Sequence, residues 1–304
     1  MGLRRAARSG RAADARRAAR LRRRRARELQ ASRRPHAPRR RAPHADVQGR
    51  QARAAHAHGG CAISDAGLTL SLVIPFYNQR ARARQTATEA ARFLREQFGE
   101  RAELIVVDDG SSPGQAVEAG DVPPGVTLIR QPRNLGKGGA VRSGVARARG
   151  EFIVFTDSDL PFSLDPLPTT VAWLRDGADI VIGDRLHPDS VCATQVTPLR
   201  QLSSVVYTWM AKHLLGLDFP DTQCGYKGYR AAVAKDLFGR LDVTSFAFEA
   251  EVLLRARKAG RQIRRQPLRL VHNEETSVRL SRHAPRMFLD TLRIAWRARR
   301  GRYG

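Results

Sequence analysis

From residue 70 onward the sequence alternates short apolar runs with longer polar stretches, and this alternation limits the folds open to the chain more than any other feature. Leu70–Phe76 and Leu104–Val107 are rich in Leu, Ile and Val, which is typical of strands covered on both faces. Three further strands are predicted, at Val126–Ile129, Phe152–Phe155 and Ile180–Ile182. Helices are predicted between the strands, at Arg80–Phe98, Gly138–Ala148 and Leu167–Arg175. Strands that alternate with helices indicate an α/β domain with a mostly parallel central sheet flanked by helices.

The positive charge of the chain is concentrated at its two ends. The 304 residues carry a formal net charge of +25, with 19 basic and 3 acidic residues in 1–60 and 8 basic and 1 acidic residue in 279–304. Residues 61–278 hold 27 basic and 25 acidic residues and are nearly neutral. A nucleic-acid-binding protein, which the net charge alone would favour, needs a basic surface on its folded part. The distribution therefore argues against nucleic acid as the partner.

Residues 1–62 form an Arg/Ala-rich stretch with almost no large apolar side chains. Such a stretch cannot bury enough apolar surface to offset the entropy of ordering, so a disordered basic arm is expected there. The arm could bind anionic lipid or nucleic acid. Alternatively, the stretch is upstream sequence translated from a mispredicted start codon.

The sequence shows no pattern typical of an export signal or a membrane span. The N-terminal stretch lacks the apolar core of a secretory signal. No window from residue 61 onward approaches the roughly 18 to 20 apolar residues that cross a bilayer. The three cysteines, Cys61, Cys192 and Cys224, are too few for a disulfide framework, which is typical of a reducing compartment. These features predict a cytoplasmic protein that is soluble or peripheral at the membrane.

Polar residues follow three of the predicted strands, at the positions where α/β sheets bind their ligands. Tyr77 follows the first strand, Asp108 and Asp109 follow the second, and Asp157-Ser158-Asp159 follows the fourth. Two carboxylates in an Asp-x-Asp pair can converge on one point, where they suit Mg²⁺ or Mn²⁺ bridging to a diphosphate. A solvated turn or a helix cap is the alternative for so short a motif.

A glycine-rich run, residues 134–140, precedes the second predicted helix and contains Lys137. Glycines let backbone N–H groups approach an anion at a helix N-terminus, and a lysine adds positive charge there. The spacing is not that of a Walker A loop. The alternative is a glycine-rich turn that packs tightly against the sheet.

Five motifs, taken together and in this order, resemble family 2 inverting glycosyltransferases of the GT-A fold, which transfer sugars from nucleotide diphosphates. They are IPFYN (74–78), VVDDGSS (106–112), RNLGKGGAVRSGVARARG (133–150), FTDSD (155–159) and DTQCGYK (221–227). Within the family, the motifs are similar to those of polyprenyl-phosphate sugar transferases, the group of dolichyl-phosphate β-glucosyltransferase and dolichol-phosphate mannosyltransferase. The resemblance covers about residues 70–277 and implies a GT-A domain at 68–278.

The resemblance implies a role for each matched position. Asp157 and Asp159 would hold the metal ion, Mg²⁺ or Mn²⁺, and the donor diphosphate. Arg185 and Arg200, with Ser204, would hold the acceptor phosphate. The implied catalytic residues are Asp157, Asp159, Arg185, Arg200 and Asp221. The residues implied to bind the nucleotide sugar are Pro75, Tyr77, Asp108, Asp109, Lys137, Ser158, Gln223, Glu249 and Glu251.

The resemblance implies an inverting transferase that moves a hexose, glucose from UDP-glucose, onto a polyprenyl (dolichyl-type) phosphate to give a β-linked lipid-phosphate sugar. Such a phosphate is already ionised at neutral pH and needs little general-base help. Three residues depart from the family pattern: Gln79 replaces a base-contacting Glu, Pro161 replaces a Gln frequent in the mannosyl enzymes, and Glu249 replaces an Asp. A GDP-mannose-dependent mannosyltransferase and a soluble family 2 enzyme acting on a hydroxyl acceptor remain the alternatives.

The C-terminal residues 279–304 predict a basic amphipathic helix, with its helical part at 285–300. One face carries apolar side chains, at Phe288, Leu289, Leu292, Ala295 and Trp296. The other carries Arg286, Asp290, Arg293, Arg297 and Arg300. This pattern is typical of a helix that lies on an anionic membrane surface. The alternative is a terminal helix that docks its apolar face on the domain.

Overall fold

The computed structural model describes residues 67–192, 198–271 and 280–303, except for the side chains at 192, 198–203 and 280–283. The described residues all belong to the second of two units, Ile63–Gly304. The predicted basic arm, residues 1–62, lies outside the described residues.

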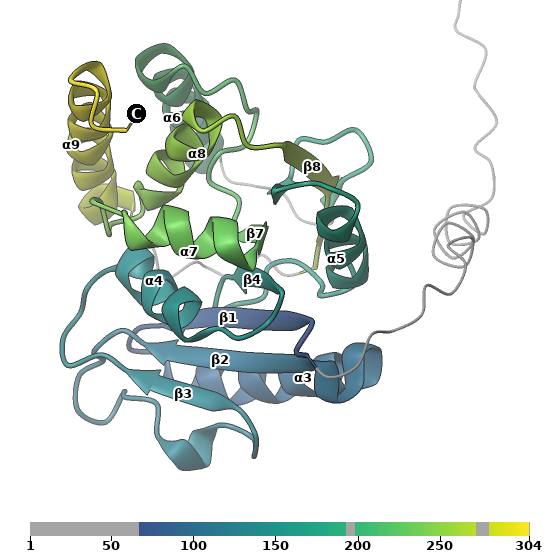
Figure 1. Cartoon of the computed structure of the whole chain (residues 1–304). Helices are drawn as coiled ribbons and strands as arrows, with labels where there is room; N and C mark the ends of the chain where they lie inside the picture. The colour runs from purple at the N-terminus through teal and green to yellow at the C-terminus, as the bar shows by residue number, and fades with distance from the viewer. Residues whose placement is uncertain (1–66, 193–197, 272–279, 304) are drawn as a thin grey trace, which may run out of the picture. The chain divides into compact units, whose positions relative to one another are not determined.

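The described chain is built on a seven-stranded sheet with the strand order β3-β2-β1-β4-β7-β5-β8 (Figure 1). The strands are β1 (Leu70–Phe76), β2 (Ala102–Asp108), β3 (Thr127–Arg130), β4 (Phe152–Thr156), β5 (Ile180–Asp184), β7 (Tyr226–Arg230) and β8 (Ile263–Pro267). A second, two-stranded parallel sheet pairs β6 (Val191–Cys192) with β9 (Arg269–Leu270). The mostly parallel α/β architecture predicted from the sequence is confirmed.

Strand β7 is the exception to the parallel arrangement. It lies between β4 and β5 and runs antiparallel to both. Lys227, the second residue of β7, pairs with Phe155 on one side and with Ile182 on the other. The sequence pattern did not predict this strand, because its residues, Tyr-Lys-Gly-Tyr-Arg, include only two apolar side chains.

Helices cover both faces of the sheet. Those of the described chain are α3 (Arg80–Phe98), α4 (Lys137–Arg147), α5 (Leu167–Arg175), α6 (Pro198–Leu215), α7 (Ala231–Gly239), α8 (Phe248–Lys258) and α9 (Leu280–Arg299), with short 3-10 helices at Gly99–Arg101 and Ala119–Asp121. The predicted helices at 80–98 and 167–175 have the observed bounds, and the one at 138–148 lies within one residue of α4.

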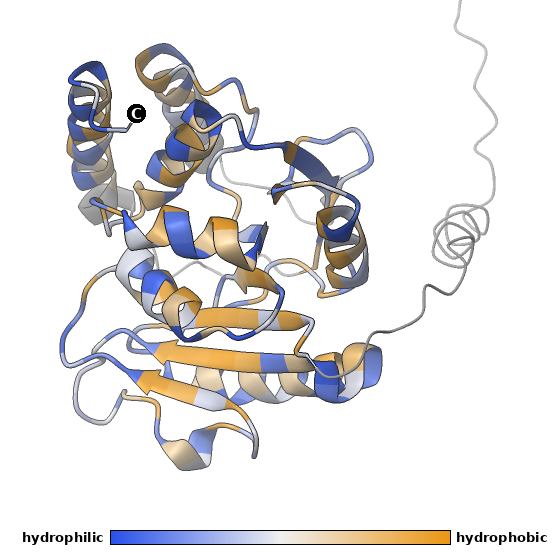
Figure 2. Cartoon of the chain, viewed as in Figure 1, coloured by the Kyte–Doolittle hydropathy of each residue, from blue (hydrophilic) through white to orange (hydrophobic). Residues whose placement is uncertain are grey.

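Alternate residues of β1 point into two separate apolar cores. Val73 packs with α4, α7 and α8 on one face, whereas Leu72 and Ile74 pack with α3 and α5 on the other. All three are fully buried, and burying one such side chain stabilises the fold by about 1.5–3 kcal/mol. In Figure 2, β1, β2 and β3 are coloured mainly as hydrophobic, whereas the helices carry both hydrophobic and hydrophilic residues.

Helix α9 joins the first of these cores. Its residues Ile294 and Ala295 are buried there, and the helix packs against α6. One side of α9 is therefore docked on the domain, as expected under the alternative to membrane contact, while other apolar residues on the helix stay exposed.

Candidate active site

The carboxyl ends of the central strands meet at one edge of the sheet. Phe76, the last residue of β1, pairs with Asp108, the last residue of β2. Because β7 is antiparallel, its first residue, Tyr226, pairs with Thr156, the last residue of β4. The segment before β7, residues 221–225, therefore reaches the same edge as Asp157. The fold thus brings four of the five sequence motifs to this edge.

Asp108 and Asp109 at the end of β2 hold the loops of this edge in place. Asp108 accepts hydrogen bonds from the N–H groups of Ser111 (2.9 Å) and Val117 (2.7 Å). Asp109 accepts them from Leu135 and Gly136, both at 2.9 Å. Burial raises the pKa of Asp109 to about 6, against the effect of the two N–H donors and with a smaller contribution from the nearby Asp108. Asp109 thus ties the glycine-rich loop to the end of β2.

Gly136 allows this loop to turn into α4. It has a φ of 86°, and a Cβ there would lie 2.5 Å from the carbonyl oxygen of Thr244. Both features favour glycine at this position. The turn places Lys137, the first residue of α4, at the strand edge.

Lys137 joins two carboxylates that are distant in the sequence. Its Nζ lies 2.7 Å from Oδ1 of Asp157 and 2.9 Å from Oε1 of Glu249. Burial by itself lowers the pKa of Lys137, but the two carboxylates outweigh it and the net shift is upward, so the lysine stays protonated. The prediction that Lys137 belongs to the site is consistent with this position.

A second lysine, Lys227 of β7, holds the other oxygen of Glu249. The Lys227 Nζ and Oε2 of Glu249 are in direct contact, and the same Nζ donates to the carbonyl oxygen of Cys224 (2.6 Å). Lys227 is fully buried, and Glu249 is nearly so. Charged side chains are buried this deeply only when they are paired. Glu249 therefore has a fixed position between two ammonium groups.

Asp157 and Asp159 are both partly buried at the strand edge, with Lys137 beside Asp157. Burial raises the pKa of Asp159, and the charge of Asp157 raises it further. Asp157 packs so closely on Gly225 that a Cβ there would lie 1.8 Å from its Oδ2. Carboxylate oxygens fit a hard divalent cation. No group of three or more His, Cys, Asp or Glu in the described part of the chain is placed to hold a metal ion.

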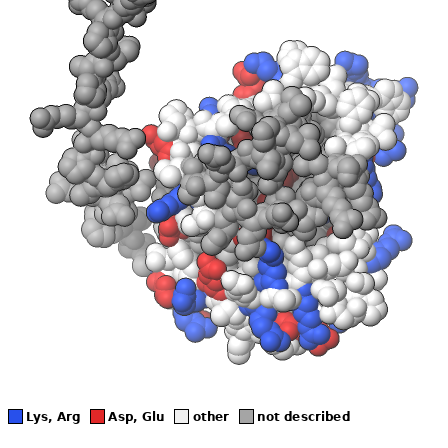
Figure 3. Space-filling model, turned by 180° about the vertical axis from the view of Figure 1, so that it is seen from behind, with Lys and Arg blue, Asp and Glu red and all other residues white. Residues whose placement is uncertain are grey.

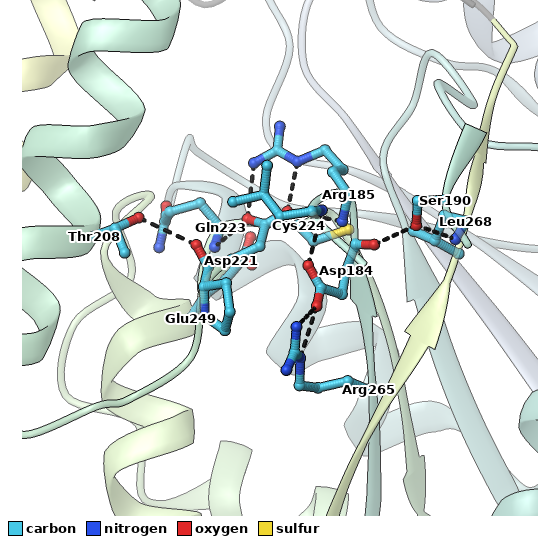
Figure 4. A network of polar contacts seen from close by, with 12 residues as sticks. Asp184, Arg185, Ser190, Thr208, Asp221, Gln223, Cys224, Glu249, Arg265 and Leu268 are labelled. Carbon is cyan, nitrogen blue, oxygen red and sulfur yellow. Dashed lines mark hydrogen bonds and ion pairs between the residues drawn. The ribbon is translucent and has the colours of Figure 1, made fainter. Parts of the chain in front are cut away.

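Arg185, directly after β5, is bound to Asp221 at two points. Its Nε and Nη2 donate to the two carboxylate oxygens at 2.6 Å and 2.8 Å (Figure 4). Burial would raise the pKa of Asp221, but the hydrogen bonds and charge of Arg185 hold it below its usual value. Two predicted catalytic residues are thus brought into contact.

The neighbouring Asp184 fixes the backbone on which Arg185 lies. It accepts a hydrogen bond from the N–H of Leu186 (2.9 Å) and one from Nε of Arg265 on β8 (2.7 Å). In Figure 4 the side chains of Asp184 and Arg185 leave the chain in different directions. Successive side chains of a strand point to opposite faces of the sheet, and Asp184 and Arg185 are successive residues at the end of β5.

Three buried polar atoms near the strand edge have no hydrogen-bond partner among the described residues. They are Oγ1 of Thr156, Oγ1 of Thr222 and Nε2 of Gln223. Buried polar atoms are almost always satisfied in a complete site. Of the three residues only Gln223 is partly exposed, so its amide suits contact with a hydroxyl group of a bound ligand.

The remaining predicted site residues have varied surroundings. Tyr77 is half-exposed beyond the end of β1, where Pro75 is buried. The Ser158 hydroxyl donates to Oε1 of Gln79 (2.7 Å), so Gln79, one of the departures from the family pattern, contacts the Asp-x-Asp segment. Ser204 is exposed on α6, and the side chain of Arg200 lies outside the described residues.

Glu251 is not brought to this cluster. Its oxygens accept hydrogen bonds from the N–H groups of Asp242 (3.0 Å) and Val243 (2.7 Å) and from Arg255 (2.9 Å). Residues two apart on a helix do not share a face, so Glu251 points away from Glu249. The structure gives it contacts that hold the loop before α8.

Sequence reasoning missed Lys227 and Gly225. Both lie in the DTQCGYK motif, but neither was assigned a role of its own. In the sequence, Lys227 stands among Tyr226, Gly228 and Tyr229. A lysine in a segment of this kind that joins a buried sheet is expected to be buried, and a buried lysine needs an acidic partner.

The fold and the strand-edge site define a GT-A transferase of nucleotide-activated sugars. Residues 71–238 match glycosyl transferase family 2. The chain belongs to this family and is a glycosyltransferase.

Two kinds of known protein resemble it. A dolichyl-phosphate beta-glucosyltransferase of Trichomonas vaginalis is 27% identical over 237 residues, covering 74% of this chain and 70% of the relative. The dolichyl-phosphate beta-glucosyltransferase of Saccharomyces cerevisiae is 29% identical over 230 residues, 67% of each chain. A crystal structure of Mycobacterium tuberculosis glucosyl-3-phosphoglycerate synthase, in complex with Mn²⁺, UDP and phosphoglyceric acid, superposes with a TM-score of 0.54 at 20% identity, covering 75% of this chain and 79% of that one. At this identity the structural likeness shows the GT-A fold.

None of the helices in residues 67–192, 198–271 and 280–303 is both long enough and apolar enough to cross a bilayer.

Proposed function

We propose that this enzyme transfers glucose from UDP-glucose to a polyprenyl phosphate of the dolichyl type, with inversion to a β-linked product. The names of its relatives in Trichomonas vaginalis and Saccharomyces cerevisiae support glucose and dolichyl phosphate. The order of the five motifs supports the same group. The preference for uridine as the nucleotide rests on the motif resemblance.

One structural observation favours a phosphate over a hydroxyl as the acceptor. Two buried acids of the site, Asp221 and Glu249, are both paired with cations: Asp221 with Arg185, and Glu249 with Lys137 and Lys227. A carboxylate that is held in this way is a poor proton acceptor. An acceptor hydroxyl would need such a base, whereas an ionised phosphate does not.

Asp157 and Asp159 would hold a divalent cation, Mg²⁺ or Mn²⁺. When bound, the ion would neutralise charge on the donor diphosphate as it leaves. Burial and the neighbouring charge of Asp157 raise the pKa of Asp159, and a divalent cation between the two carboxylates would stabilise their ionised forms.

The protein's own residues orient and neutralise the reactants. Lys137, next to Asp157, lies where its charge favours a diphosphate. Arg185 stays positively charged while it is bound to Asp221, and this charge would attract the acceptor phosphate toward the sugar. Gln223, with its unpartnered amide, would contact a hydroxyl of the transferred sugar.

A transfer assay tests the proposed function. The purified protein is incubated with Mn²⁺, a polyprenyl phosphate and radiolabelled UDP-glucose or GDP-mannose, and the label in the lipid extract is measured. We expect label from UDP-glucose, in a product released by mild acid as glucose. Label from GDP-mannose alone would overturn the choice of donor. Label on a free hydroxyl acceptor and none on the phosphate would overturn the choice of acceptor. The assay is done at the surface of detergent micelles, because we place the reaction at the cytoplasmic face of a membrane.

A further inference from the structure

Exposed large apolar side chains are concentrated on two neighbouring helices. In the described part of the chain eleven such side chains are exposed, and seven of them belong to α6 and α9. They are Val205, Val206, Trp209, Phe288, Leu289, Leu292 and Trp296, which we call the α6–α9 surface. Large exposed apolar area of this kind marks an interaction site.

Helix α9 has three distinct faces. Thr291, Ile294 and Ala295 are buried against the domain. The exposed apolar residues of α9 recur at positions 288, 289, 292 and 296 and therefore lie on one side of the helix, apart from the buried face. The arginines at 286, 293, 297 and 300 are spaced by seven, four and three residues and form a third face. The docking of α9 on the domain thus leaves Phe288, Leu289, Leu292 and Trp296 exposed.

Helix α6 repeats this arrangement beside it. Met210, Ala211 and Leu215 are buried, while Trp209 is 59% exposed and Val205 is 60% exposed. The two helices pack together, and the hydroxyls of Tyr207 and Thr291 are 3.5 Å apart. Figure 3, which views the molecule from behind, shows mainly uncharged surface over this part, with Lys and Arg along its outer edge.

The charge around the α6–α9 surface is strongly positive. Residues 280–303 contain seven arginines and a single acid, Asp290. Asp290 is buried and is paired with Arg293 (2.9 Å), with Arg286 at 3.8 Å. The Arg300 guanidinium lies 3.8 Å above the ring of Trp296. Arginine and half-exposed tryptophan beside an apolar strip are typical of helices that lie in the headgroup region of a bilayer.

We propose that the α6–α9 surface docks this enzyme on an anionic lipid bilayer, with its apolar side chains inserted at the level of the headgroups. A second copy of the chain fits less well, because it would bring two clusters of arginines together. The proposal rests on exposed apolar area and charge, so it stands whether or not the donor and acceptor proposed above are correct.

The docking surface is connected to the strand-edge site through α6. The Thr208 hydroxyl, on the same helix as Trp209, donates to the carbonyl oxygen of Pro220 (3.4 Å), the residue before Asp221 (Figure 4). One helix therefore contacts the segment that carries Asp221 and presents apolar residues to the outside. Docking through this helix would hold the acceptor side of the site close to the bilayer.

Vesicle binding tests the proposal. The full-length protein is mixed with vesicles of phosphatidylcholine containing about 30% phosphatidylserine, a composition with the negative surface potential of a cytoplasmic leaflet. The bound fraction is measured by sedimentation, and insertion is measured as quenching of tryptophan fluorescence by brominated phosphatidylcholine. We expect binding and quenching, both at least tenfold weaker on phosphatidylcholine alone.

The decisive variant is Trp209→Ser with Trp296→Ser, and a second variant, Phe288→Ser with Leu289→Ser, probes the same surface. Each should bind anionic vesicles at least tenfold more weakly while it keeps the thermal unfolding midpoint of the parent. Leu186→Ser with Val271→Ser, which removes two exposed apolar side chains elsewhere, is the matched control and should bind as the parent does.

Three results would overturn the proposal. Binding by the first two variants that equals the parent's would assign membrane contact to another part of the chain, and an absence of quenching would show adsorption without insertion. A dimer of the parent that both variants lose would assign the surface to a second copy. Transfer to a short-chain, water-soluble isoprenyl phosphate separates these results from the proposed function. This transfer should be the same in the parent and in the variants if only docking is affected.

Discussion

Lys137 and Asp157 are joined by an ion pair of 2.7 Å, and this contact links the glycine-rich loop to the Asp-x-Asp segment. The two residues come from different elements, the start of α4 and the end of β4. Oδ1 of Asp157 is bound to the lysine, while Oδ2 lies against Gly225. Binding of a cation to Asp157 therefore changes the surroundings of Lys137 as well.

Replacing Asp157 tests the metal assignment. We expect Asp157→Asn to lower the rate of transfer roughly 100-fold or more, because charge on the departing diphosphate loses its stabilisation. The apparent affinity for Mn²⁺, measured by titration of activity, should fall in parallel. Asp165→Asn, at an exposed acid outside the cluster, is the control. A variant at Asp157 with full activity and unchanged Mn²⁺ dependence would refute the assignment.

Gly225→Ala should impair the site through a steric effect. A Cβ at this position would lie 1.8 Å from Oδ2 of Asp157, so the carboxylate must move. We expect roughly 10-fold to 100-fold weaker transfer, because displacement of a reacting group by about 1 Å can have an effect of this size. Gly239→Ala, where a Cβ meets no atom within 4 Å, should leave activity unchanged. Equal activities of the two variants would show that the position of Asp157 is unimportant.

Lys227 is expected to be important for stability. Lys227→Met leaves Glu249 buried with one of its two cations, and breaking a buried pair lowers the free energy of unfolding by about 3–5 kcal/mol. Urea denaturation measures the change. Lys235→Met, at an exposed position on α7, should change it by less than about 0.5 kcal/mol. A loss below about 1 kcal/mol at Lys227 would mean that Glu249 is neutral or solvated in the folded protein.

The pKa of Asp109, raised to about 6 by burial, predicts two effects of pH. The folded protein binds a proton there at pH values where the unfolded chain, with a carboxyl pKa of about 4, has released it. The stability that this proton contributes is present at low pH and is lost as the pH rises through about 6. The carboxylate of Asp109 is mostly ionised only above this pH. The ionised form is the one that would accept hydrogen bonds from hydroxyl groups of the nucleotide-sugar donor.

Donor binding measured at several pH values tests the functional effect. The affinity for UDP-glucose, which has no phosphate group titrating in this range, should weaken roughly tenfold from pH 7 to pH 5. Asp109→Asn should bind more weakly at pH 7 and lose this pH dependence, since an amide does not titrate. A parent affinity that is constant over the range would remove Asp109 from the donor site.

Arg185→Lys separates charge from geometry. A lysine keeps the positive charge but cannot make the two-point contact with Asp221. We expect the KM for the lipid phosphate to rise roughly 10-fold while the KM for UDP-glucose changes little. Arg264→Lys, at a solvent-exposed pair with Asp176, is the control. A change confined to the KM for UDP-glucose would place Arg185 on the donor side instead.

Much of the fold follows from local sequence. The apolar runs at β1 and β4 and the helical stretch of α3 specify their own conformations, because the spacing of apolar residues matches the period of each element. The right-handed crossover of parallel units then places Asp109 and Asp157 at one edge. The five motifs are themselves local sequence, so their resemblance to family 2 does not depend on any tertiary contact.

The contacts that assemble the site depend on tertiary structure. Lys227 meets Glu249 because β7 inserts, antiparallel, between β4 and β5, and a polar strand of five residues gives no local signal of that pairing. Similarly, amphipathic spacing predicted α9, but only its packing on α6 decided which of its apolar residues are buried and which are exposed. The sequence alone determined the apolar strands, the helices between them and the chemistry of the strand ends, since these depend on neighbouring residues. Ion-pair partners and exposed faces depend on residues that are distant along the chain, so only the folded structure decided them.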